Sequence, residues 1–327
     1  MRAAWYSVTG PARNVFTIGE MPAPEPGPGD VRVRLQTSGV NPSDAKSRSG
    51  ATGRNNGYPR VIPHSDGAGV IDMLGDGVPG DRLGRRVWVH NAQYQRPFGT
   101  AAEYVVLPEQ LAVNLPSQTD FAAGACLGIP VLTAHHAVAG DAPVAGRTVL
   151  VCGGAGAVGH YAVQIAKLKG ATVVATVSTD EKARHARDAG ADHTINYRTE
   201  DVVLRLMDIT GGRGADRIID IDTTVNARVL PHLIAPFGTI ASYGAKAPAA
   251  TLPVRDLRNK NVTMRFILIY AVGHDQIAAA IADVTSLLSA GRLKHTVARR
   301  FPLGEIATAH EAVENGSLIG NVVLDIG

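Results

Sequence analysis

Four glycines, at positions 153, 154, 156 and 159, separate an apolar run from an amphipathic run in the stretch VLVCGGAGAVGH. A strand over 148–152 and a helix over 157–169 are predicted on either side of them. This order matches the fingerprint G-x-G-x-x-G, in which a backbone without side chains approaches a pyrophosphate at a helix N-terminus. The pattern favours a dinucleotide loop formed by Gly154, Ala155, Gly156, Ala157 and Val158. A strand–turn–helix with a purely structural role is the alternative.

Apolar strands alternate with helical runs through the middle of the chain. We expect strands over 171–177, 216–221, 238–243 and 262–270, and helices over 127–140, 180–189 and 226–235. Strands joined through helices pair in parallel, with right-handed crossovers. This part of the chain is therefore predicted to form a doubly wound parallel sheet.

The N-terminal segment has a different, β-rich pattern. Alternation over 31–40 places Val31, Val33 and Leu35 on one face of a strand, and Gly and Pro separate the short strands that follow. The C-terminal segment returns to this composition, with a helix over 274–291 and a last strand over 321–326. A chain of 327 residues suits two domains. We predict an α/β protein in which 1–122 and 271–327 form a β domain and 123–270 form an inserted nucleotide-binding domain.

Composition excludes several classes of protein. Hydrophobic residues make up 45% of the chain and charged residues 19%, as in soluble globular proteins. No apolar run reaches the ~18–20 residues of a membrane span, and the N-terminus lacks the apolar core of a secretory signal. The two cysteines, Cys126 and Cys152, cannot build a disulfide framework. We therefore expect a cytoplasmic protein with no membrane partner. The net charge of +3 is too small to decide on partners, but the basic residues are scattered among acidic ones and form no aromatic-rich basic patch, so no nucleic-acid partner is expected.

The end of the second strand of the predicted sheet bears on the choice of cofactor. An NAD site usually carries Asp or Glu there, which binds the ribose 2′-hydroxyl. Val177 and Ser178 occupy this region instead, and Lys182, which follows, is suited to pair with a 2′-phosphate. The sequence therefore favours NADPH, although Asp180 would repel a phosphate beside it. Ser178-x-x-Glu181 also predicts a capping box at the start of the next helix.

Metal and nucleophile chemistry have little support in the sequence. His64 and Asp66 lie close together in IPHSDGAGVI, and His135 and His136 are adjacent. No HExxH motif occurs, and two cysteines are too few for most Cys/His zinc sites. No GxSxG motif occurs either. We expect no bound metal, and surface or packing roles for His135 and His136.

Eight segments together point to one family. They are SGVNPSDAKSRSG (38–50), IPHSDGAGVI (62–71), GDRLGRRVW (80–88), GTAAEYVVLP (99–108), GACLGIPVLTAHHAV (124–138), GGAGAVGHYAVQIAK (153–167), EKARHARDAGADHTINY (181–197) and AHEAVENGSLIGNVVL (309–324). In order and spacing, the chain resembles the zeta-crystallin-like quinone oxidoreductases, the zinc-free branch of the medium-chain dehydrogenase/reductase superfamily. The resemblance covers essentially the whole chain. It implies a GroES-like β domain and a Rossmann domain, with substrate and nicotinamide between them.

The resemblance also assigns cofactor contacts residue by residue. Asn41 and Asp44 are expected on the nicotinamide side, and Thr133 near the nicotinamide carboxamide. Around the 2′-phosphate it places Ser178, Lys182 and Tyr197, and around the nicotinamide pocket Tyr243, Gly244, Phe266 and Leu268. The strand that holds the last two residues is expected to pair with its copy in a homodimer. Zinc-bearing relatives carry Cys and His near the positions of Asn41 and Ser65, and Gly at the position of His64.

The substrate side departs from the family. Lys46 and Thr52 stand where relatives often carry tyrosines. We expect Asn41, Lys46 and Thr52 to be the catalytic group, with Lys46 and Asn41 stabilising a developing oxyanion. The function predicted is NADPH-dependent reduction of a small quinone without zinc. A reductase of activated alkenes (enoyl compounds or 2-alkenals) on the same fold is the alternative, followed by a non-catalytic NADPH- or RNA-binding protein.

Overall fold

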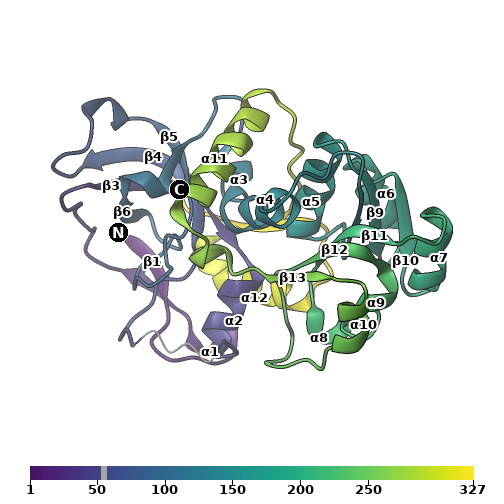
Figure 1. Ribbon diagram of the computed structural model, residues 1–327. Helices are drawn as coiled ribbons and strands as arrows, with labels where there is room; N and C mark the ends of the chain where they lie inside the picture. The colour runs from purple at the N-terminus through teal and green to yellow at the C-terminus, as the bar shows by residue number, and fades with distance from the viewer. Residues whose placement is uncertain (53–56) are drawn as a thin grey trace. The chain divides into compact units, whose positions relative to one another are not determined.

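The computed structural model describes residues 1–52 and 57–327, and the chain divides into two compact units (Figure 1). One unit consists of Met1–Ile129 together with Thr285–Gly327, and the other of Pro130–Val284. The boundaries expected from the sequence, after residues 122 and 270, fall earlier in the chain than these. Within the described ranges, no helix is both long enough and apolar enough to cross a lipid bilayer.

The unit Pro130–Val284 is built on a parallel sheet with strand order β10-β9-β8-β11-β12-β13. The strands are β8 (Thr148–Val151), β9 (Thr172–Val177), β10 (His193–Asn196), β11 (Ala215–Asp220), β12 (Ile234–Ser242) and β13 (Thr263–Phe266). The chain runs outward from β8 to β10 and then returns to the opposite side of β8 as β11. This reversal is a topological switch point, where open α/β sheets bind ligands beyond the carboxyl ends of their strands.

Helices cover both faces of this sheet (Figure 1). They are α4 (Leu132–Ala139), α5 (Ala157–Leu168), α6 (Asp180–Asp188), α7 (Val202–Ile209), α8 (Thr223–Asn226), α9 (Leu230–Leu233) and α10 (Val254–Asn259). Helix α11 (His274–Ser289) contains the boundary between the two units. The predicted helix over 127–140 starts as a wider turn over Leu127–Val131 that contains Pro130.

Several predicted elements of this unit need correction. The helix expected over 226–235 is reduced to α9, and α8 ends at its first residue, Asn226. Pro231 lacks an N–H group and would clash with an earlier carbonyl in a continuous helix, and β12 begins at Ile234. The strand expected over 262–270 ends at Phe266. Strand β10 and helix α7 were not predicted. The sequence of β10, HTIN, is short and has one fully buried residue, Ile195, so it carries a weak periodic signal.

The other unit contains a mainly antiparallel sheet with strand order β14-β15-β3-β4-β5-β7, in which β6 also pairs with β3. Its strands are β3 (Asp30–Val40), β4 (Asp66–Leu74), β5 (Arg86–Val89), β6 (Tyr104–Pro108), β7 (Ala112–Asn114), β14 (Val297–Pro302) and β15 (Asn321–Asp325). Val31, Val33 and Leu35 share the buried face of β3, which confirms the predicted alternation. A separate pair joins β1 (Arg2–Trp5) to β2 (Thr17–Glu20).

Short helices complete this unit. They are α1 (Ala12–Val15), α2 (Pro42–Ser49), α3 (Phe121–Gly124) and α12 (Ile306–Asn315). Helix α2 follows β3 directly, with Asn41 as its N-cap, Pro42 in its first turn and Gly50 in the left-handed region at its end. These are the ordinary start and stop signals of a helix. Packing of α2 against α12 brings residues from both ends of the chain together.

Candidate active site

The cofactor residues expected from the sequence lie where strands of the parallel sheet end. The glycine loop follows β8, Ser178 follows β9, Tyr197 follows β10, and Tyr243 and Gly244 follow β12. Phe266 is the last residue of β13, and Leu268 comes shortly after it. Because all these strands are parallel, their carboxyl ends form one edge of the sheet. The fold therefore brings residues that are distant in sequence to the edge where a dinucleotide is expected. Thr133 lies within α4 and is buried.

The glycines of the loop differ in what their missing side chains allow. A Cβ at Gly159 would lie 2.1 Å from the carbonyl oxygen of Gly153, and one at Gly154 would lie 2.6 Å from Cβ of Ala175. These two glycines are thus required by the packing of helix α5 and strand β9. A Cβ at Gly156, the N-cap of α5, would meet only the Gly153 carbonyl oxygen, at an ordinary 3.4 Å. Gly156 leaves room beside the helix N-terminus, which fits the close approach of a pyrophosphate.

Lys182 and Asp180, whose charges have opposite effects on a bound 2′-phosphate, lie on different faces of helix α6. Residues three and four apart share a face of a helix, and residues two apart do not. Lys182 shares a face with His185, whose ring stacks on that of His160 in α5, with ring centroids 4.4 Å apart. Lys182 therefore lies on the side of α6 that is nearer to α5, the helix of the glycine loop.

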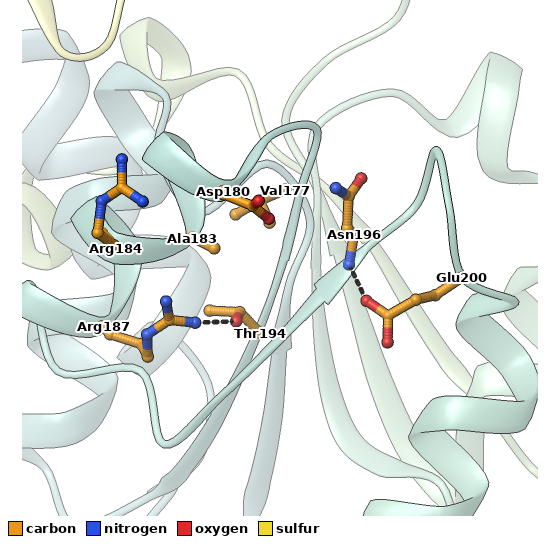
Figure 2. A pocket seen from close by; sticks show the side chains of 8 residues that line it. All are labelled: Val177, Asp180, Ala183, Arg184, Arg187, Thr194, Asn196 and Glu200. Carbon is orange, nitrogen blue, oxygen red and sulfur yellow. Dashed lines mark hydrogen bonds between the residues drawn. The ribbon is translucent and has the colours of Figure 1, made fainter.

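Asp180 lies on a different face of α6, beside Ala183, Arg184 and Arg187. Together with β9, β10 and the turn after β10, this face lines an open pocket of about 390 Å³ (Figure 2). The lining residues are Val177, Asp180, Ala183, Arg184, Arg187, Thr194, Asn196 and Glu200. Figure 2 shows Arg187 donating to Thr194 Oγ1, at 2.7 Å, and the backbone N–H of Asn196 donating to Glu200, at 2.7 Å. Asp180 thus faces this pocket, away from the face that carries Lys182.

The start of α6 corrects one sequence-based expectation. The N-cap is Thr179, whose Oγ1 accepts a hydrogen bond from the backbone N–H of Lys182 at 3.2 Å. The expected capping box at Ser178 and Glu181 is therefore wrong, and the N-cap lies one residue later than expected. The Thr179 side chain pairs with a backbone N–H in the first turn of α6, so Ser178 is not needed as the helix cap.

A buried polar cluster at the ends of β11 and β12 was missed by sequence reasoning. Asp220 is fully buried and accepts hydrogen bonds from Thr223 Oγ1, at 2.6 Å, and from Asn226 Nδ2, at 2.7 Å. Thr223 also lies 2.5 Å from the Ser242 hydroxyl. The phenolic oxygen of Tyr243 is buried without a hydrogen-bond partner among the described residues, and burial raises the pKa of Tyr243. The sequence feature that could have revealed this cluster is Asp220, a carboxylate that ends the strand sequence RIID.

In the other unit, Asn41 lies between two buried carboxyl groups. Its backbone N–H donates to Asp44 Oδ2 at 2.8 Å, and its side-chain Nδ2 donates to Asp66 Oδ2 at 2.8 Å. Burial raises the pKa of Asp44 to about 7 and holds the pKa of Asp66 well above its ordinary value. Lys46 and Thr52, the other proposed catalytic residues, are exposed, Lys46 on the last turn of α2.

Helix α2 is held by an arginine that sequence reasoning also missed. Arg48 is almost fully buried, and its guanidinium donates to the Gly10 carbonyl and pairs with Glu314 of α12. Arginine is rarely buried unless it is paired. Arg48 therefore fixes the helix that carries Asn41, Asp44 and Lys46.

His64, a candidate metal ligand in the sequence, is part of a buried hydrogen-bond chain. Thr100 Oγ1 donates to the Asp66 carbonyl at 2.6 Å, so the Ser38 hydroxyl, 2.7 Å away, donates to Thr100. Ser38 then accepts from His64 Nδ1 at 2.8 Å, which leaves His64 Nε2 to accept from His310 Nε2 at 2.9 Å. Burial lowers the pKa of His64 to about 3 and holds the pKa of His310 well below its ordinary value.

The backbone at His64 explains the difference from relatives that carry glycine there. Its φ angle is +77°, in the left-handed region that glycine occupies without strain. The buried hydrogen bonds of its ring hold the residue in this conformation. His135 and His136 bond Asp283 and Arg265 respectively, which are contacts within their own unit.

Comparisons with known proteins agree on the family. A family model described as "Alcohol dehydrogenase GroES-like domain" matches residues 27–117, and one described as "Zinc-binding dehydrogenase" matches 157–286. The quinone oxidoreductase of Lama guanicoe is 30% identical over 326 residues, which are 99% of this chain and 97% of that protein. The chain belongs to the zeta-crystallin-like quinone oxidoreductase family of the medium-chain dehydrogenase/reductase superfamily.

Other members of the superfamily show its range. A 2-haloacrylate reductase of Burkholderia sp is 31% identical over 319 residues, which are 94% of each chain. Among solved structures, an NAD-dependent alcohol dehydrogenase has a TM-score of 0.91 at 30% identity and covers 100% of both chains. The Escherichia coli quinone oxidoreductase complexed with NADPH has a TM-score of 0.88 at 25% identity and covers 99% of this chain and 100% of its own. The GroES-like and Rossmann-type domains expected from the sequence are confirmed.

One family description names zinc, so we tested whether the residues of this chain could hold it. In 1–52 and 57–327, no group of three His, Cys, Asp or Glu residues is placed to bind a metal ion. Both ring nitrogens of His64 are already hydrogen-bonded. Cys126 and Cys152 are buried, and burial raises the pKa of both thiols, which opposes the thiolate form that binds zinc. These residues do not fit a zinc site.

Proposed function

We propose that this chain is an NADPH-dependent oxidoreductase that reduces quinones without zinc. The observation that carries the proposal is Gly156, the glycine of the loop whose missing side chain serves no close contact within the described residues. Space at that point suits a pyrophosphate. Full-length likeness to quinone oxidoreductases, one of them solved with NADPH, supports the substrate class and the cofactor.

Each set of residues has a role in this proposal. Backbone groups of Gly154 through Val158 hold the pyrophosphate, and Ser178, Lys182 and Tyr197 surround the 2′-phosphate. Thr133, Tyr243, Gly244, Phe266 and Leu268 orient the nicotinamide, with Asn41 and Asp44. When bound, NADPH supplies a hydride, which must be held ~3–3.5 Å from the electrophilic atom of the substrate.

Lys46 is the preferred group for stabilising negative charge that develops on the substrate oxygen. Lys46 is an exposed basic residue on α2, whereas Asn41 is buried and its amide nitrogen donates to Asp66. Asn41 therefore offers its carbonyl oxygen and one remaining N–H. Thr52 supplies a hydroxyl close to Lys46 in the sequence. We expect Lys46→Ala to lower kcat/KM for the best quinone.

Reduction of activated alkenes is the second candidate function. The observation that favours it is the 2-haloacrylate reductase among the relatives, which matches almost the whole chain. Thr52 stands where related enoyl reductases carry a proton-donating tyrosine, which weakens this candidate.

The proposal includes a homodimer in the cytoplasm and no nucleic-acid partner. Strand β13 is at the edge of the parallel sheet, and the Phe266 side chain at its end is 70% exposed. An open edge with an exposed aromatic residue suits pairing with a second copy. Sedimentation of the purified protein distinguishes a dimer from a monomer.

A screen of electron acceptors tests the function. The purified protein is mixed with NADPH or NADH and with 1,4-benzoquinone, 9,10-phenanthrenequinone or a short 2-alkenal, and loss of the reduced cofactor is followed. We expect NADPH oxidation to be fastest with a quinone. Activity with the alkenal alone would replace the proposal with the second candidate. Absence of activity with every acceptor, together with salt-sensitive RNA binding, would favour a binding protein.

A further inference from the structure

The carboxylate of Asp66 is held by the backbone on one side and by a single side chain on the other. Both of its oxygens accept from the backbone N–H of Ile129, at 3.0 and 2.9 Å. Its Oδ2 also accepts from Asn41 Nδ2, at 2.8 Å. Asp66 is fully buried, so these contacts replace all hydration of the carboxylate.

The surroundings of Asp66 fix its position independently of Asn41. A Cβ at Gly128 would lie 2.0 Å from Asp66 Oδ1, so the chain around Gly128 is wrapped against the carboxylate. A Cβ at Gly39 would lie 3.2 Å from Asp66 Cβ. The Thr100 hydroxyl donates to the Asp66 backbone carbonyl. Asp66 is therefore the anchored partner, and the amide of Asn41 is the group that it orients.

We propose that Asp66 is a positioning residue that turns the Asn41 amide so that its nitrogen is directed inward and its carbonyl oxygen remains to accept a hydrogen bond. This inference rests on the proposed function, in which Asn41 contacts the nicotinamide or the substrate. Asp66 Oδ2 accepts hydrogen bonds from both Ile129 and Asn41, and an accepting oxygen pairs only with the nitrogen end of the amide. Asp66 itself touches neither cofactor nor substrate in this proposal.

The substitution Asp66→Asn removes this control with little change in shape. Oδ2 of Asp66 accepts from both Ile129 and Asn41, and the introduced amide can place either its oxygen or its NH2 group there. An oxygen at this position pairs with the Asn41 NH2 group, and an NH2 group pairs only with the Asn41 oxygen, so the Asn41 amide is no longer held in one orientation. The group presented outward is then no longer fixed as an acceptor.

The kinetic test is a double-mutant cycle on purified protein with NADPH and the best acceptor found. Asp66→Asn is expected to lower kcat/KM roughly 10- to 100-fold, the loss that follows from one buried polar group left without its hydrogen-bond partner. In the Asn41→Ala background the same change is expected to have less than about a twofold effect, because no amide remains to be oriented. Asp72→Asn is the matched control, since Asp72 lies on the same strand and pairs with Arg32 at 2.9 Å. The control is expected to keep wild-type kcat/KM.

A second measurement needs no catalytic activity. Side-chain amide signals of protein labelled with 15N-asparagine are recorded, and the Asn41 pair is assigned by its loss in Asn41→Ala. Asp66→Asn should shift this pair and speed its hydrogen exchange, while Asp72→Asn should leave it in place.

The outcomes separate the inference from the proposed function. Equal losses from Asp66→Asn in both backgrounds, or an unmoved Asn41 signal, would overturn the positioning role even if quinone reduction is confirmed. A wild-type protein that reduces no acceptor contradicts the proposed function, and the amide signal then decides whether Asp66 orients Asn41.

Discussion

The two units place their polar groups in opposite ways. In Pro130–Val284, most candidate cofactor residues follow the ends of parallel strands, and the proposed pyrophosphate contact is made by the backbone at Gly156. In the other unit, Asn41, His64, Asp66 and His310 are buried side chains contributed by three distant parts of the chain. The first arrangement depends on the order of elements along the chain. The second depends on individual side-chain contacts, so single substitutions should affect the two units differently.

The largest effect is expected from a pair of substitutions within the glycine loop. Gly159→Ala forces a Cβ against the Gly153 carbonyl and should lower the free energy of unfolding by about 3 kcal/mol, as overpacking of a rigid contact does. Gly156→Ala meets no such contact and should cost less than about 1 kcal/mol. It should instead weaken NADPH binding by at least roughly 10-fold, because the pyrophosphate loses its close approach. Urea unfolding and cofactor titration measure the two effects.

If Gly156→Ala destabilises the protein as much as Gly159→Ala, the space at Gly156 belongs to packing. The difference between the two glycines would then disappear, together with the main support for the proposed cofactor site.

The next effect concerns the two faces of α6. Lys182→Ala should raise the Kd for NADPH roughly 10- to 100-fold and leave that for NADH nearly unchanged, since only NADPH carries the 2′-phosphate. Arg184→Ala is the matched control, because Arg184 faces the pocket between α6 and β10 with Asp180 (Figure 2). Fluorescence titration with both cofactors measures the constants. Equal losses for NADPH and NADH in Lys182→Ala, or a comparable NADPH loss in Arg184→Ala, would show that the assignment of faces is wrong.

The smallest effect is a pH dependence of the free energy of unfolding that arises from the unit Met1–Ile129 and Thr285–Gly327. His64, whose pKa is lowered from 6.5 to about 3, binds a proton below pH 6.5 only in the unfolded chain, so acid destabilises the fold. Asp44, whose pKa is raised from 3.8 to about 7, binds its proton first in the folded chain, so acid between these values adds stability. The two effects have opposite signs.

Asp44→Asn removes the stabilising contribution of acid. The free energy of unfolding of this variant should therefore fall more steeply than that of the wild type, by about 1.4 kcal/mol for each pH unit between about pH 6.5 and 5. Urea unfolding at several pH values measures the slope, with Asp72→Asn as a control that should keep the wild-type slope. Parallel slopes in Asp44→Asn and the wild type would mean that Asp44 stays ionised in the folded protein.

Sequence patterns predicted the parallel sheet well and the side-chain clusters poorly, for physical reasons. Strand and helix periodicity located β8, α5, β9 and α6, because a buried parallel strand needs a continuous apolar run. Strand β10 was missed because Ile195 is its single fully buried residue. The cap of α6 was misplaced by one residue because Ser178 and Thr179 both suit an N-cap.

The partners of Asn41 had no local signal. Asp66 was noted as a possible metal ligand, but its pairing with Asn41 depends on the register between β3 and β4, in which Gly39 lies opposite Asp66. Arg48 and Glu314 are separated by 266 positions along the chain. No periodic pattern encodes a contact of that kind, so the structure was needed to find it.

The pairing of β15 with β3 has a consequence for biosynthesis. Val322 lies opposite Val40 in this ladder, so Thr37–Val40 of β3 lack a partner strand on this edge until β15 has been synthesised, whereas Asp30–Arg34 pair with β6. The parallel sheet of Pro130–Val284 contains no strand from outside that segment and can assemble earlier. Domains generally fold as units during synthesis. During synthesis, the unit Pro130–Val284 therefore has all the strands of its sheet before the other unit does. The other unit begins earlier in the chain but needs β15.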